Sequence, residues 1–267
     1  MAIVINPISP VAFSILGIDI RWYALAYIAG FIAGYILFRR LMRDTDSRVK
    51  LDARGLDDLL TAIVFGVILG GRIGYVLFYN LGFFIENPWE IFAVWHGGMS
   101  FHGGLIGVII ATCVFAWRRK ISALAILDLL AVVVPIGLFF GRIANFINRE
   151  VMGRPTDMPW GIVFNGDVAI PRHPSPLYEA TAEGIVLFAV MYGLYRCTNL
   201  RMRPGALGGI MAMAYALLRT FCEMFRAPDV QIGFLTSWGL TMGQLLSAIM
   251  FCVGATIFTI AIWKKYV

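Results

Sequence analysis

Long apolar segments recur along the whole chain and constrain its fold more than any other feature. About 20 apolar residues in a helix are needed to cross a hydrocarbon core of about 30 Å. Segments of roughly this length occupy residues 22–40, 58–79, 99–117, 123–141, 176–196, 205–225 and 240–263. With 60% hydrophobic and only 14% charged residues, the chain is too apolar for an ordinary water-soluble domain. The sequence therefore predicts an all-α membrane protein with seven transmembrane helices in one integral membrane domain, residues 1–267.

The basic residues indicate how these helices are oriented. Short loops rich in Lys and Arg remain on the cytoplasmic side. Basic clusters follow the first, third, fifth and seventh spans, at every second boundary between spans. They are, in this order, Arg39, Arg40, Arg43, Arg48, Lys50 and Arg54; Arg118, Arg119 and Lys120; Arg196, Arg201 and Arg203; and Lys264 and Lys265. We therefore predict an N-terminus on the outer, periplasmic side, a C-terminus in the cytoplasm, and a periplasmic segment between the fourth and fifth helices. The first 22 residues lack the basic start and cleavage pattern of a removed signal peptide, so the first helix is expected to remain.

The other basic residues lie on the outer side or in the outer halves of the spans, and all of them are arginines. They are Arg21, Arg72, Arg142, Arg149, Arg154, Arg172, Arg219 and Arg226. The planar guanidinium pairs bidentately with phosphate, whereas lysine acts as a point charge, so this asymmetry indicates an anion bound on the outer side. The alternative is that some of them extend to the interface or pair with loop carboxylates. The net charge of +6 does not indicate nucleic acid, because the basic residues lie beside apolar spans.

Two of the candidate residues lie in the second and third spans. Arg72, in Gly70-Gly71-Arg72-Ile73-Gly74-Tyr75, is an intramembrane charge and hence a candidate for binding a ligand; the alternative is a buried ion pair. His102 is flanked by Gly103 and Gly104, and its imidazole could accept a proton near neutral pH. The alternative for His102 is a hydrogen-bonded structural histidine.

The densest polar run is Gly141 to Gly153, at the outer end of the fourth span. If the helix continues through it, Arg142, Asn145 and Arg149 share one face. Arg142 and Asn145 would then bind a phosphate, and Glu150 would orient the arginine or accept a proton. A helix stop at Gly153 is the structural alternative for that glycine.

Further polar residues belong to the sixth and first spans. Arg219 is expected in the outer half of its span, and Glu223 follows it by four residues, so the two could form an ion pair. Arg226 lies nearer the interface. Tyr23 opens the first span, where tyrosine is often an interfacial anchor.

Together these motifs resemble those of bacterial prolipoprotein diacylglyceryl transferases. The run Gly141–Gly153 matches the family signature. Four further patterns occur in the expected order along essentially the whole chain: Gly-Gly-Arg-Ile-Gly-Tyr, Gly-Gly-Met-Ser-Phe-His-Gly-Gly, His-Pro-Ser-x-Leu-Tyr-Glu and Arg-x-x-x-Glu-x-x-Arg. Two positions depart from it: His96 stands where an acidic residue is common, and Pro176 where Gln is common.

The resemblance implies a membrane enzyme of the bacterial inner membrane. Such enzymes transfer the diacylglyceryl group of phosphatidylglycerol to the lipobox cysteine of a preprolipoprotein, without metal or other cofactor. It implies that Arg142 and Arg219 are the principal essential arginines. The other matching positions are Tyr23, His102, Asn145, Glu150, Gly153 and Glu223. The chemistry requires charge stabilisation at a leaving phosphate and removal of a thiol proton, for which we predict the arginines and His102, respectively, with Glu223 orienting Arg219.

Two other classes of protein share some of these features. A transporter or channel for an anionic solute would also contain intramembrane arginines, but its polar groups would be expected near the midplane. An intramembrane serine protease would need Ser100 or Ser175 beside a histidine, and neither serine lies in a Gly-x-Ser-x-Gly motif.

Overall fold

The computed structural model is mostly helical, as the apolar periodicity predicts. It describes residues 2–166, 170–228, 233, 235–236 and 239–263. Within these residues, six helices are long and apolar enough to cross a membrane, so the chain has the character of a multi-pass membrane protein. The predicted basic cluster at Lys264 and Lys265 lies outside the described residues.

Each of the seven predicted apolar segments forms a helix. Their observed bounds are α1 Trp22–Met42, α2 Ala53–Phe78, α4 Phe101–Arg119, α5 Ala123–Ile147, the continuous run of α6 Ser175–Glu179, η3 Ala180–Val186 and α7 Leu187–Cys197, α8 Ala206–Glu223 and α9 Met242–Trp263. The helix not counted among the six candidate spans is α8, whose 18 residues include Arg219 and Glu223 near its end. Those two charges lower its mean hydropathy.

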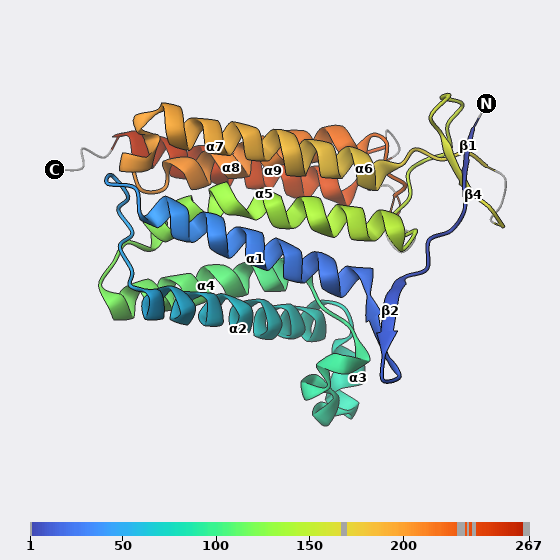
Figure 1. Ribbon diagram of the computed structural model, residues 1–267, viewed down its shortest axis with the longest axis horizontal. Helices are drawn as coiled ribbons and strands as arrows, with labels where there is room; N and C mark the ends of the chain where they lie inside the picture. The colour runs from blue at the N-terminus through green and yellow to red at the C-terminus, as the bar shows by residue number, and fades with distance from the viewer. Residues whose placement is uncertain (1, 167–169, 229–232, 234, 237–238, 264–267) are drawn as a thin grey trace. The chain divides into compact units, whose positions relative to one another are not determined.

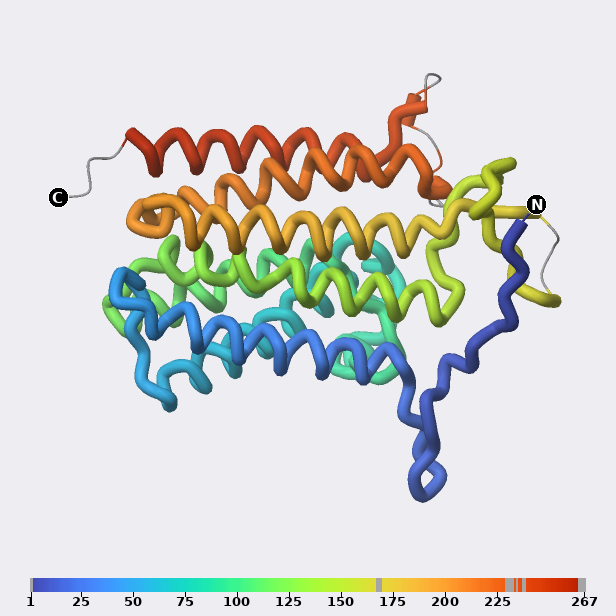
Figure 2. The backbone as a smooth tube through the Cα atoms, turned by 45° about the horizontal axis from the view of Figure 1, so that its top comes forward, coloured from blue at the N-terminus to red at the C-terminus, as the bar shows by residue number. Residues whose placement is uncertain are grey.

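The prediction of an all-α chain was incomplete, because two small sheets lie outside the long helices. The strand β1 (Ile3–Ile5) pairs in parallel with β4 (Ile162–Phe164), and β2 (Val11–Ile15) forms an antiparallel hairpin with β3 (Ile18–Arg21). Figure 2 shows the N-terminal strand beside the distant segment around β4. The remaining short helices are α3 Leu81–Glu86, η1 Pro88–Phe92, η2 Val94–His96 and η4 Asn199–Met202.

The chain forms two compact units, and unit 1 comprises Met1–Phe38 and Asp128–Val267. In this unit α7, α8 and α9 run side by side (Figure 1). Gly209 and Gly254 allow α8 and α9 to approach closely, since a Cβ on Gly209 would lie 2.7 Å from the carbonyl oxygen of Gly254. The buried Asp128 of α5 accepts hydrogen bonds from the amides of Gly205 and Gly208, both at 2.7 Å. It thus caps the N-terminus of α8 from a neighbouring helix.

Unit 2 comprises Arg39–Leu127 and is built on the contact between α2 and α4. Glycines on both helices face one another there, so the backbones approach too closely for larger side chains. A Cβ on Gly70 would lie 2.8 Å from the Cα of Gly107, and a Cβ on Gly74 would lie 2.8 Å from the Cα of Gly103.

We predict that Gly70→Leu destabilises the protein, because the added side chain must push α4 away from α2. Thermal unfolding of the purified protein in detergent should show a melting temperature lower by several degrees, equivalent to about 2 kcal/mol or more. Gly82→Leu is the matched control, since a Cβ at Gly82 meets nothing within 4 Å. An unchanged melting temperature for Gly70→Leu would contradict the close packing described.

Candidate functional site

Three arginines and three glutamates form a buried cluster in unit 1, hereafter the Arg–Glu network. Its members are Arg142, Glu179, Glu183, Arg219, Glu223 and Arg226. They come from α5, from the run α6–η3, from α8 and from the residues just after α8. The two arginines that the sequence placed in separate spans therefore meet through shared carboxylates.

Glu179 is the centre of the Arg–Glu network. Its Oε2 lies 2.9 Å from Nη1 of Arg142, and its Oε1 lies 2.9 Å from Nη1 of Arg219 and 3.3 Å from Nη1 of Arg226. One carboxylate thus links three guanidinium groups. Removing its charge would leave the three guanidinium groups with only two carboxylates in the network, so their mutual repulsion would be less well compensated.

The other two carboxylates each fix particular arginines. Oε2 of Glu183 lies 3.2 Å from Nη2 of Arg142, and its Oε1 lies 3.6 Å from Nη1 of Arg219. Oε2 of Glu223 accepts a 2.5 Å hydrogen bond from Nη2 of Arg219, one helical turn earlier. Arg219 therefore contacts all three glutamates.

Exposure within the network is unequal. The side chains of Glu179 and Glu183 are 1% and 0% exposed, whereas that of Arg142 is 20% exposed. The two glutamates are thus shielded from solvent, whereas Arg142 is partly exposed. Within the described residues, Nε of Arg142 and Nε of Arg219 have no hydrogen-bond partner. Arg142 and Arg219 therefore each keep an N–H donor that the described part of the protein does not use.

Local backbone geometry brings Glu183 to α5. Glu183 lies in η3, a turn of π-helix, a conformation that often occurs at functional sites. The next residue, Gly184, packs so tightly on α5 that a Cβ there would lie 2.7 Å from Cβ of Phe139. This close approach places the carboxylate of Glu183 beside Arg142.

The helix α5 continues through Arg142 and Asn145 but stops before Arg149, so the predicted shared face is limited to the first two residues. The helix α5 ends at Ile147, and Arg149 has a φ of 58°. Nδ2 of Asn145 instead donates to Oε2 of Glu150 at 2.9 Å, and the amide of Asn148 contacts the other oxygen at 3.3 Å. Glu150 is thereby held by two asparagines.

Tyr23 lies half-buried near the start of α1, with its ring 5.0 Å from that of Tyr27 one turn later. Tyr27 lies within electrostatic reach of Arg142 and Glu150. The start of α1 therefore borders the same polar region as the end of α5.

Gly153 is required by close packing rather than by a helix stop, since α5 ends six residues earlier. Its N–H donates to the carbonyl of His173 at 2.9 Å, and it bridges to Arg226. A Cβ at this position would lie 2.5 Å from the carbonyl oxygen of Phe225 and 2.6 Å from that of His173. Gly153 therefore lets its own segment pack directly against the segments of His173 and Phe225, next to Arg226.

His173 lies just before the candidate span Ser175–Cys197 and packs against the rings of Tyr178 and Phe225. Its Nδ1 lies 3.1 Å from the hydroxyl of Tyr178, which also accepts a 2.7 Å hydrogen bond from the indole of Trp160. Partial burial lowers the pKa of His173 below its ordinary value, because burial disfavours the charged imidazolium.

Arg72, in unit 2, has a different environment from the arginines of the Arg–Glu network. Its Nε donates to Ile91 O at 2.9 Å, Nη2 donates to the carbonyls of Glu90 and Ala93, and Nη1 donates to those of Gly97 and Gly98. All five N–H groups are therefore used by the backbone of residues 90–98. The geometry favours a role in shaping this loop over the ligand contact expected from the sequence.

His102 lies in the first turn of α4 and is exposed. Its ring contacts that of Phe101 edge to face at 5.6 Å between centroids. Among the described residues it has no hydrogen-bond partner, unlike the structural histidine considered as the alternative.

Neither candidate serine has the environment of a protease nucleophile. Ser100 caps α4 by accepting from the amide of Gly103 at 3.2 Å, and the hydroxyl of Ser175 donates to Val151 O at 2.8 Å. In the part of the chain that the structure describes, neither serine hydroxyl is hydrogen-bonded to a histidine side chain, although the backbone amide of Ser175 donates to the carbonyl of His173 at 2.8 Å.

Comparison with known proteins identifies the family. The family model for prolipoprotein diacylglyceryl transferase matches residues 10–260. The chain belongs to this family. It is 54% identical over 256 residues to the phosphatidylglycerol–prolipoprotein diacylglyceryl transferase of Azospirillum brasilense, covering 95% of this chain and 94% of that protein. Proteins of the same name from Rhodospirillum rubrum and Methylocella silvestris are 52% and 48% identical, with 95% and 97% of this chain covered, and 92% and 96% of those proteins.

The sequence did not lead us to predict two members of the Arg–Glu network, Glu179 and Glu183. Glu179 was noted only as part of the His-Pro-Ser-Pro-Leu-Tyr-Glu motif, and Glu183 was not singled out. Two acidic residues four positions apart in an apolar span indicate that cationic partners lie nearby, because carboxylates inside a membrane span are rare and are almost always paired. That pattern pointed to the partners of Arg142 and Arg219.

We predict that Arg72→Lys loosens the loop of residues 88–98, because an ammonium group has only three N–H donors for the five carbonyls. Hydrogen exchange of this loop should become faster by about tenfold or more, as expected when hydrogen bonds to a buried charge are lost. Arg118→Lys, on an exposed residue of the same unit, is the control. Equal protection of the loop in both variants would show that the carbonyl contacts do not hold it.

Proposed function

We propose that this chain transfers the diacylglyceryl group of phosphatidylglycerol to the lipobox cysteine of a preprolipoprotein. The observation that carries the proposal is the Arg–Glu network, in which Arg142 and Arg219 are fixed by shared carboxylates yet retain donors for an anion. Family membership gives the reaction, since the relatives bear the name of this activity.

The reaction is an alkyl transfer with a phosphate leaving group. The cysteine sulfur forms a bond to the glycerol carbon of the diacylglyceryl group, and the bond from that carbon to the phosphate oxygen breaks. The bonding electrons leave with glycerol-1-phosphate, and the thiol proton passes to a base. Negative charge therefore grows on the phosphate, and preorganised guanidinium groups lower the energy of that transition state.

The roles of individual residues follow from this chemistry. Arg142 and Arg219 bind the phosphate, and Glu223 holds Arg219 in place through its 2.5 Å contact. His102 is the proposed general base, because an imidazole without an internal partner is available to accept the thiol proton. This role rests on the chemistry of His102 and on the family motif.

The remaining proposed substrate-binding residues act beside the Arg–Glu network or indirectly. Arg226 shares Glu179 with Arg219, and Gly153 lies beside Arg226. Asn145 and Glu150 form one hydrogen-bonded pair, and Tyr23 borders them through Tyr27. Arg72 acts indirectly, through the loop that it shapes.

We further propose that α8 crosses the membrane as a seventh span, with the N-terminus outside and the C-terminus in the cytoplasm of a bacterial inner membrane. Its charged residues are paired, Arg219 with Glu179 of α6 and with Glu223 of α8 itself, and this pairing lowers the free-energy cost of placing them in a membrane. Phosphatidylglycerol and the preprolipoprotein signal peptide are the proposed partners, and no cofactor, metal or nucleic acid takes part.

A transporter for an anionic solute is the alternative class of function. The named activity of the relatives, over more than 90% of this chain, favours the transferase. The decisive experiment incubates the purified chain in detergent with phosphatidylglycerol and a lipobox peptide, and follows glycerol phosphate release and peptide mass. An unmodified cysteine under all lipid and peptide concentrations would refute the proposed transfer.

We predict that Arg142→Lys lowers kcat by about 10²–10³-fold, because an ammonium group cannot bridge Glu179 and Glu183 and also bind a phosphate. The measurement is glycerol phosphate release under saturating lipid. Arg21→Lys keeps the same chemical change on an exposed outer arginine and should leave the rate unchanged. Full activity of Arg142→Lys would place the phosphate elsewhere.

We predict that His102→Gln abolishes turnover while phosphatidylglycerol still binds, because glutamine is similar in size but does not accept the thiol proton. Turnover and lipid binding should be measured on the same preparation, with His96→Gln as control for loss of an exposed histidine. A rate within a few-fold of wild type would exclude His102 as the base.

A further inference from the structure

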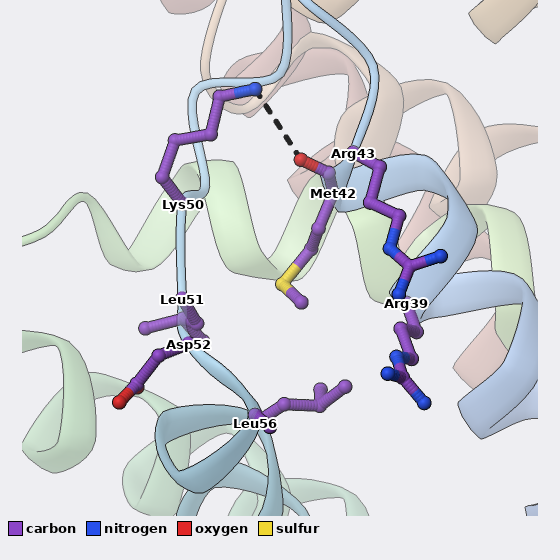
Figure 3. A pocket seen from close by; sticks show the side chains of 8 residues that line it. Arg39, Met42, Arg43, Lys50, Leu51, Asp52 and Leu56 are labelled. Carbon is purple, nitrogen blue, oxygen red and sulfur yellow. Dashed lines mark hydrogen bonds between the residues drawn. The ribbon is translucent and has the colours of Figure 1, made fainter.

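A hollow of about 500 Å³ lies in unit 2, where α1 ends and α2 begins (Figure 3). Its volume is that of a small-molecule site. The residues around it combine cationic and apolar side chains: Arg39, Met42, Arg43, Lys50, Leu51, Asp52, Ala53 and Leu56. None of them takes part in the proposed transfer.

The cationic side chains of the hollow are not neutralised by the protein. Arg39 and Arg43 are separated by one turn of α1, and Figure 3 shows both beside the hollow. Neither guanidinium has a hydrogen bond or ion pair within the described residues. The one carboxylate in the lining, Asp52, already accepts from the amide of Gly55 at 2.9 Å to cap α2. The hollow therefore carries an excess of positive charge.

The walls of the hollow are held in place by local contacts. Nζ of Lys50 donates to the carbonyl of Asp44 at 2.6 Å and to that of Met42 at 3.4 Å. The hydroxyl of the buried Ser47 donates to Val49 O at 3.2 Å. The loop that joins α1 to α2 is thus ordered by its own hydrogen bonds, and it positions Lys50 across from the two arginines.

The apolar part of the lining distinguishes a lipid from a free ion. Met42 and Leu56 are only 6% and 3% exposed, and Leu51 lies beside them. Inorganic phosphate gains nothing from such a wall, whereas the glycerol backbone and first methylene groups of a lipid do. Basic pockets at the cytoplasmic ends of transmembrane helices attract anionic headgroups.

We propose that this hollow is a second anion site, separate in composition from the Arg–Glu network, and that it binds the phosphate of an anionic phospholipid in the cytoplasmic leaflet. Arg39 and Arg43 contact the phosphate, Lys50 adds its charge from the opposite wall, and Met42 and Leu56 contact the apolar part of the lipid. The proposal rests on the orientation given under the proposed function, which places this end of unit 2 on the cytoplasmic side.

The test measures lipid retention by native mass spectrometry of the full, delipidated chain titrated with phosphatidylglycerol. Every arm carries Arg142→Gln, which removes one of the two phosphate contacts proposed for the Arg–Glu network, so the arms differ from one another only at and around the hollow. Arg39→Gln with Arg43→Gln should weaken the remaining site by roughly thirtyfold, as expected for two lost guanidinium contacts at a membrane surface. Arg40→Gln with Arg54→Gln removes the same charge from neighbouring exposed residues that do not line the hollow, and should leave binding unchanged.

Three results would overturn the proposal. Equal weakening by both double variants would mean that only general surface charge is sensed, and no weakening by Arg39→Gln with Arg43→Gln would mean that the hollow holds no lipid. Displacement of the lipid by millimolar inorganic phosphate would identify a site for the free ion. Arg39→Lys with Arg43→Lys, which keeps the charge, should retain part of the affinity and so separates lost contacts from a damaged fold.

The outcome is independent of catalysis, because the readout is retained lipid rather than product. Absence of diacylglyceryl transfer in the peptide assay would refute the proposed function and leave the lipid titration interpretable. Conversely, full transfer by Arg39→Gln with Arg43→Gln, together with unchanged lipid retention, would refute this site alone.

Discussion

The sharing of Glu179 among three arginines is the interaction on which the rest of unit 1 depends. A carboxylate that is 1% exposed inside an apolar bundle carries a large desolvation cost, which only close cationic partners can offset. Those partners come from α5, from α8 and from the turn after α8. Pairing the charge therefore fixes the positions of three chain segments at once, and it holds the three guanidinium groups together.

Arginines on the long helices are stabilised in two ways in this molecule. Arg72 donates all of its N–H groups to carbonyl oxygens of the loop, so none is left to bind a ligand. Arg142 and Arg219 are instead paired with carboxylates and keep Nε unbound among the described residues. Under the proposed function, this difference decides which arginine can exchange partners with an incoming phosphate. It cannot be read from the sequence, where all three are single charges in apolar segments.

The sequence predicted the helices well because each apolar segment has the length of a membrane crossing. It also singled out Arg142, Arg219 and Glu223, whose types are improbable in such segments without a purpose. It did not predict β2 and β3, because their turn is Leu16-Gly17, with φ values of 51° and 82°, rather than a common Asn-Gly pair. Nor did it predict Glu179 as the centre of the Arg–Glu network, because contacts between distant segments follow from packing and not from spacing.

The cap that Asp128 places on α8 has a mechanical consequence. Asp128 ties the start of α8 to α5, and Glu179 joins Arg142 of α5 to Arg219 near the other end of α8. Two helices fastened near both ends cannot slide along one another without breaking buried polar contacts. Under the proposed function, a movement that admits a two-chain lipid to these arginines would therefore leave α5 and α8 fixed relative to one another, and other parts of unit 1 would have to move instead.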